Sequence, residues 1–319
     1  MPKLHQPHSG SMAYWPRKRS SKTLPSVNWS PVKEKSIQKG LLGFIGYKAG
    51  MARLLVKDNT NDSRTKGKQI IVPITIIECP PQKILSVRFH KDKNILFETI
   101  NTNLDKELKR KIKFPKNTKI SLDDAKKRLN EIDNITAIAY SIPKKIKSKK
   151  TPDLLEIGIG GDLKEKFEFI KENINKEFLV KDIFAKNQIV DIKGLTRGLG
   201  NQGPVKRFGI GLKSHKAEKG QRRPGNLGPW TPSRVSFRVP QLGQTGFFSR
   251  IKLNNKIMDI QEGQKITFEI ENYGKILGDV LFIKGSIQGT PKRQLIIYPS
   301  PRQKRRTTKE NFEVIKLLK

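Results

Sequence analysis

Short apolar runs, many rich in β-branched residues, recur along most of the chain and are separated by polar turn residues. Turn residues such as Asn59, Asp62 and Pro80 divide the early runs. Short strands divided by turn signals predict a mainly β fold, either a barrel or a sandwich. The expected strands cover residues 41–45, 52–56, 70–77, 84–89, 136–142, 154–159, 189–192, 251–260, 265–270, 280–284 and 295–298.

Residues 101–185 carry a helical period and predict an α/β insertion. Ser121 suits an N-cap with Asp124 three residues on, and apolar residues of one helical face follow from Leu122 to Ile132. Leu163–Ile174 repeats the spacing in a second helix. Residues 143–150 form a lysine-rich loop, for which a solvated loop and an RNA contact are both open.

Residues 193–250 interrupt this pattern, because no apolar period of 2 or 3.6 runs from Lys193 to Pro232. Val235, Phe237 and Val239 alternate with polar residues and predict a strand that pairs with 189–192. The excursion between them is then a finger on the β-domain.

Residues 193–250 as a whole hold twelve Lys/Arg against the single acid Glu218, and eleven of the 25 glycines of the chain. Lys and Arg neutralise phosphates, and glycine lets the backbone approach a sugar-phosphate surface closely. A disordered basic linker is the alternative. Trp230, between Pro229 and Pro232, argues against a linker because it offers a stiffly held stacking surface.

The whole chain is also strongly basic, with 65 Lys/Arg against 29 Asp/Glu and a formal charge of +36. Such self-repulsion implies a polyanionic partner. The single cysteine, Cys79, excludes an internal disulfide framework and a cysteine zinc cluster. His5 and His8 lack further ligands, so no metal is expected. Without a membrane-length apolar run or a signal peptide, a cytoplasmic protein is expected.

Both ends of the chain carry further basic clusters. In the N-terminal tail, Tyr14 and Trp15 stand beside Arg17, Lys18 and Arg19, which suits base stacking next to phosphate pairing, although a localisation or solubility tail is the alternative. The C-terminal tail carries Arg302, Lys304, Arg305 and Arg306.

We find no nucleotide-binding loop and no catalytic triad. The glycine clusters at 158–161 and 209–211 lack the spacing of a phosphate loop. A non-enzyme is therefore expected. An RNA-modifying or RNA-cleaving enzyme and a free regulatory RNA binder are the alternatives.

Several motifs of the sequence are similar to motifs of a known protein family. They occur in the same order as in that family, from about residue 13 to about residue 293. They are residues 13–20, 46–51, 194–207, 228–235, 240–246 and 281–292. With them the sequence resembles the large-subunit ribosomal protein L three (L3) family, in its archaeal and eukaryotic form. Two positions depart from the family. Eukaryotic relatives have a histidine where this chain has Glu218, and many relatives have a histidine where it has Thr231.

The resemblance implies a translation-protein-like β-barrel in the large ribosomal subunit, bound to large-subunit rRNA and beside neighbouring ribosomal proteins. It implies a role in early assembly and translation, with the Trp230 tip near the peptidyl transferase centre. We expect no membrane association, no stable homo-oligomer and no cofactor. Any structural Mg²⁺ would be bound through rRNA.

The sequence thus predicts an N-terminal extension (1–39), a first barrel part (40–100), the insertion (101–185), the rest of the barrel with its finger at 194–234 (186–299) and a C-terminal tail (300–319). The expected RNA-binding residues are Tyr14, Trp15, Arg17, Lys18, Arg19, Arg197, Lys206, Arg207, Lys213, His215, Lys216, Lys219, Arg222, Arg223, Trp230, Arg234, Arg238, Arg250, Arg302, Lys304, Arg305 and Arg306.

Overall fold

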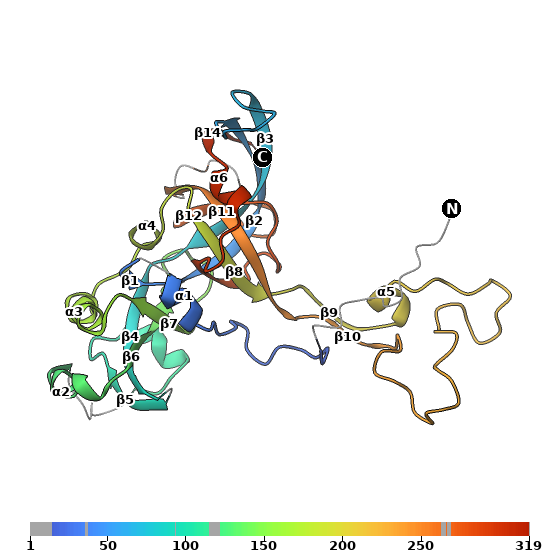
Figure 1. Ribbon diagram of the computed structural model, residues 1–319, viewed down its shortest axis with the longest axis horizontal. Coiled ribbons are helices and arrows are strands. Elements are labelled where there is room, and N and C mark those ends of the chain that lie inside the picture. Colours follow the sequence, from blue (N-terminus) through green and yellow to red (C-terminus); the bar gives the residue numbers. More distant parts are fainter. Residues whose placement is uncertain are drawn as a thin grey trace. The chain divides into compact units, whose positions relative to one another are not determined.

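The computed structural model describes residues 15–35, 38–92, 94–114, 122–262, 266 and 269–318 (Figure 1). The chain divides into two compact units. One holds residues 1–22 and 195–249, and the other holds residues 23–194 and 250–319. We call them the basic unit and the β unit. The fold is mainly β, as the sequence predicts.

A closed antiparallel barrel forms one part of the β unit. Its strands pair in the ring β2-β3-β12-β11-β8-β13, and β13 returns to pair with the start of β2, where Ile45 faces Ile296. β14 adds to the far half of β2. The strands are β2 (Phe44–Asp58), β3 (Gln69–Cys79), β8 (Ile189–Leu195), β11 (Ser249–Glu262), β12 (Asp279–Lys284), β13 (Gln294–Pro299) and β14 (Phe312–Leu318).

A second, five-stranded antiparallel sheet has the order β1-β7-β6-β4-β5. Its strands are β1 (Gly40–Leu41), β4 (Gln82–Lys91), β5 (Asn94–Ile100), β6 (Asn134–Ser141) and β7 (Leu154–Gly160). Figure 1 shows helices α2 and α3 beside this sheet. The helical segments of the β unit are α1 (Ser30–Lys35), η1 (Lys106–Arg110), α2 (Leu122–Lys127), η2 (Leu129–Glu131), α3 (Leu163–Asn173), α4 (Val180–Ile183) and α6 (Arg305–Lys309).

One apolar core joins the barrel to the five-stranded sheet. It contains Phe44 and Leu295 from the barrel together with Phe89, Ile135 and Ile157 from the sheet. Burying these side chains on both sides is the main stabilising contribution to the β unit. The sequence assigns residues 82–100 to the first part of the barrel. They lie in the second sheet instead, because β4 pairs with β5 and β6. The domain boundaries themselves stay a prediction.

The two terminal segments of the β unit are more structured than the expected tails. Trp29 is buried, and its Nε1 donates to the carbonyl of Glu156 at 2.9 Å. Its ring fills the space over Gly158, where a Cβ would lie 2.9 Å from the Trp29 Cβ. At the other end, β14 completes the barrel sheet, with Val314 facing Val56. Trp29 belongs to the joint core, whereas Phe312 of β14 belongs to a second apolar cluster of the barrel.

Two local predictions need comment. The strand expected at Val235–Val239 is wrong, because these residues lie in an irregular segment and the side chains of Val235 and Phe237 are about half exposed. The helix at Leu163–Ile174 is confirmed as α3, which Asp162 and Glu165 cap reciprocally. The expected Ser121 cap lies outside the described residues, as do residues 265, 267 and 268 of the expected strand 265–270.

Candidate nucleic-acid interface

A two-stranded ribbon and one short helix organise the basic unit. β9 (Gly198–Gln202) pairs with β10 (Gly243–Gly246), and α5 (Pro204–Phe208) follows β9. Gly246 has φ +74° at the end of the ribbon, and a methyl group there would overlap the carbonyl oxygen of Arg197. The close approach of the two strands thus requires glycine at this position.

Arg207 ties α5 to the returning chain. Its Nε donates to the carbonyl of Gln244 at 3.1 Å, and its Nη1 donates to the carbonyl of Gln241 at 3.1 Å. Partial burial, and then repulsion by Arg17, lower the pKa of Arg207. An arginine remains charged despite such a shift, since its ordinary pKa is above about 12. Arg207 therefore acts as a structural cation within the unit.

The N-terminal segment packs along the same unit. The backbone N–H of Ser20 donates to the carbonyl of Phe247 at 3.0 Å. Arg17 lies with its guanidinium carbon 4.9 Å from the ring centre of Trp15 and 4.5 Å from that of Phe208. Trp15 in turn lies 5.2 Å from the ring of Phe237. Cation–π and aromatic contacts thus hold the N-terminal segment on the unit.

Most predicted cations of the basic unit are exposed. Within the described ranges, none of the following residues forms an ion pair with a carboxylate: Lys18, Arg19, Arg197, Lys206, Lys213, Lys216, Lys219, Arg222, Arg223, Arg234 and Arg238. His215 is exposed as well. An array of positive charges without internal counter-charges favours association with a polyanion.

Trp230 is 92% exposed, which is exceptional for the largest apolar side chain. Gly228, with φ +137°, precedes it, and the residues from Leu227 to Val235 enclose a shallow pocket around it. No folding energy comes from a ring in this position. It is available to stack on a partner.

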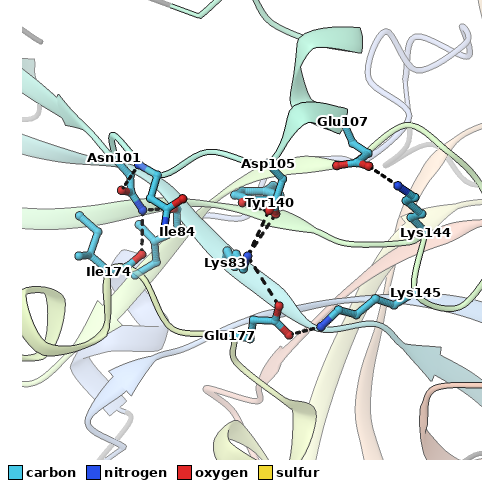
Figure 2. A network of polar contacts seen from close by, with 11 residues as sticks. Lys83, Ile84, Asn101, Asp105, Glu107, Tyr140, Lys144, Lys145, Ile174 and Glu177 are labelled. Carbon is cyan, nitrogen blue, oxygen red and sulfur yellow. Dashed lines mark hydrogen bonds and ion pairs between the residues drawn. The ribbon is translucent and has the colours of Figure 1, made fainter.

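Lysines of the β unit have a different environment. In the loop 143–150, Lys144 pairs with Glu107 at 2.6 Å, Lys145 pairs with Glu177 at 2.5 Å, and Lys149 pairs with Asp153. Figure 2 shows the neighbouring Lys83, which lies between Asp105 and Glu177. These ion pairs favour the interpretation of residues 143–150 as a solvated loop, because carboxylates of the same protein already neutralise much of the positive charge of the loop.

The structure does not place every predicted residue in the basic unit. Arg302, Lys304, Arg305 and Arg306 are exposed at and before α6 in the β unit, where the backbone N–H of Lys304 donates to Asn254 Oδ1 at 2.9 Å. Arg250 is half-buried and also belongs to the β unit. Tyr14, His5 and His8 lie outside the described residues.

Phe208 and Phe247 contact the N-terminal segment but are not among the RNA-binding residues that the sequence predicts. The adjacent pairs Arg207-Phe208 and Phe237-Arg238 were the available signal, since a cation next to an aromatic residue can form part of a stacked row. Among the residues that the structure describes, no group of three His, Cys, Asp or Glu side chains could hold a metal ion. In those same ranges no helix is long and apolar enough to cross a membrane.

The chain combines a closed β-barrel with a unit rich in cations and aromatic rings. It therefore belongs to the class of basic β-barrel proteins. The family model of ribosomal protein L3 matches residues 1–317. The large ribosomal subunit protein uL3 of Methanoregula boonei is 40% identical over 95% of this chain and 94% of its own length. Those of Methanococcoides burtonii and Methanospirillum hungatei are 37% and 36% identical, over 95% and 92% of this chain and 94% and 91% of their own lengths. The chain belongs to the ribosomal protein L3 family.

Proposed function

We propose that this chain is a structural, non-catalytic component of the large ribosomal subunit whose basic unit binds large-subunit rRNA. The observation that carries the proposal is the set of exposed cations from Arg197 to Arg238 without carboxylate partners among the described residues. A sugar-phosphate backbone supplies the missing counter-charge at high density.

Two glycines of the basic unit support a close partner. At Gly211 and Gly225 an added Cβ would meet no atom within 4 Å, and neither residue has a positive φ. Nothing within the described chain therefore requires glycine there. An outside surface that approaches the backbone closely, as RNA does, would require it.

The basic unit would contact rRNA during early assembly, with Trp230 near the peptidyl transferase centre, and other large-subunit proteins would adjoin the β unit. The site of action would be the cytoplasmic ribosome. The exposure of Trp230 supports a tip that rests on a partner.

Quantitative mass spectrometry across a sucrose gradient of cell extract tests this function. We expect one copy per large subunit, retained after a salt wash that strips loosely bound factors. Recovery mainly in free fractions would overturn the structural role and favour a transient RNA binder. A further check is the salt dependence of rRNA binding, which must be steep if phosphate contacts dominate.

A further inference from the structure

Six side chains from three separate segments form a continuous row in the basic unit. In spatial order they are Arg238, Phe237, Trp15, Arg17, Phe208 and Arg207. Each neighbouring pair is in cation–π or aromatic contact, with separations from 4.5 to 5.7 Å. The row therefore joins the N-terminal segment, α5 and the irregular segment before β10.

The contacts within this row cover the rings of Trp15 and Phe237 only partly. Trp15 is 40% exposed and Phe237 is 53% exposed, although their centres are 5.2 Å apart. Their planes are tilted by 51°, so the pair forms an angled apolar surface. Exposed aromatic surface next to cations is the combination that binds single-stranded nucleic acid.

Arg17 fixes the position of this surface. Its guanidinium lies over both Trp15 and Phe208, and Phe208 is buried. The indole is thus held against α5 through Arg17 instead of moving with the N-terminal segment. Arg17 is a positioning residue. Lys18 follows it in the chain and is exposed, and the exposed Arg238 lies with its guanidinium carbon 5.7 Å from the ring centre of Phe237.

We propose that Trp15 and Phe237 together form a stacking site for one unpaired nucleobase of an RNA strand, whose adjoining phosphates pair with Lys18 and Arg238. The inference rests on the proposed rRNA binding and adds the kind of RNA that this site takes. A base in a duplex has both faces covered, so only an unstacked base can use the rings. Purines, with the larger ring system, bind more strongly than pyrimidines.

The test compares two RNA probes with the full-length chain. One is a single-stranded oligouridylate with a central 2-aminopurine, whose weakly stacking neighbours leave that base unstacked, and the other is the same strand paired with its complement. We expect binding of the single strand to quench 2-aminopurine fluorescence. Trp15→Leu and Phe237→Leu should each weaken binding of the single strand about 10-fold and abolish the quench, while duplex affinity changes less than about twofold.

Matched variants separate stacking from general damage. Trp15→Phe keeps an aromatic ring and should retain most of the affinity. Leu242→Ala removes an apolar side chain that is 65% exposed in the same unit, and should leave both affinities unchanged. Circular dichroism of each variant verifies that the β unit remains folded.

Equal losses on the single strand and the duplex would overturn the stacking site, because the rings would then only organise the unit. An unchanged affinity of Trp15→Leu for the single strand would overturn it too. In both cases salt-dependent binding by the wild-type chain would leave the proposed function standing. A wild-type chain that does not bind the single strand would overturn the stacking site, whereas the proposed function is decided separately by co-sedimentation with the large subunit.

Discussion

The hydroxyl of Tyr47 donates a hydrogen bond of 2.6 Å to Oδ2 of Asp153, and this contact links the barrel strand β2 to the residue that precedes β7 of the five-stranded sheet. Both residues are buried, and Ser141 and Lys149 complete the cluster. Burial, and then the charge of Asp153, raise the pKa of Tyr47 well above its ordinary value. The phenol thus remains a donor at neutral pH.

Tyr47→Phe should destabilise the protein by about 1.5–3 kcal/mol, because it removes a donor from a buried carboxylate. Chemical unfolding followed by circular dichroism measures the effect. Tyr298→Phe is the matched control. Tyr298 is also buried, and its hydroxyl makes no hydrogen bond to any residue that the structure describes, so its loss should change stability little. Equal effects of the two substitutions would contradict a stabilising role for the Tyr47–Asp153 bond.

The buried carboxyl group of Asp191 should make the stability of the protein depend on pH. Burial raises its pKa above the ordinary 3.8, although the N–H of Asn254 donates to it at 2.7 Å. The folded state therefore keeps the proton to higher pH than the unfolded state. Its stabilising effect is present below pH 3.8 and is lost as the pH rises through the folded pKa. Asp191→Asn should gain stability relative to wild type between acidic and neutral pH.

Asp58 provides the opposite control for this titration. Hydrogen bonds from Thr60 and Thr65 lower the pKa of Asp58, so its stabilising effect is present above the ordinary pKa and is lost in acid. Asp58→Asn should therefore lose stability relative to wild type as the pH rises from acidic to neutral. Unfolding curves at several pH values measure both trends. Parallel trends in the two variants would refute the assignment.

The two tryptophans Trp29 and Trp230 should behave oppositely on truncation. Trp29→Ala opens a cavity in the core and should cost about 3–5 kcal/mol. Trp230→Ala removes a ring that is 92% exposed and should change the free energy of unfolding by less than about 0.5 kcal/mol. If Trp230 contacts rRNA, its loss should instead alter chemical probing of the RNA near the tip. A large loss of stability in Trp230→Ala would contradict the exposed position.

Paired and unpaired cations should contribute differently to RNA binding. Replacing Arg222 and Arg223 by Gln should lower the slope of log affinity against log salt by up to about two units, because each exposed cation contacts about one phosphate. The matched double variant of Lys144 and Lys145 changes the same charge at residues paired with Glu107 and Glu177. Its slope should remain that of wild type. Equal slopes in both variants would show that the lack of a carboxylate partner does not select the phosphate contacts.

The sequence by itself determined the β character, the α3 helix and the concentration of positive charge. These features depend on local period and composition, which neighbouring residues reveal directly. The alternation at 154–159 and the spacing of Leu163, Phe167 and Ile170 both predict what β7 and α3 show. The prediction of a strand at Val235–Val239 is wrong because its expected partner, β8, pairs with β11 and β13 instead.

Only the tertiary structure decided which strands close the barrel and which cations are left without counter-charges. β4 joins the second sheet, and Phe312–Leu318 completes the first, because strand pairing depends on contacts between distant segments. Lys144 and Arg222 look alike in a basic sequence, yet among the residues that the structure describes only Lys144 meets a carboxylate. The contact of Trp15 with Phe237 likewise joins distant segments, which local sequence patterns do not specify.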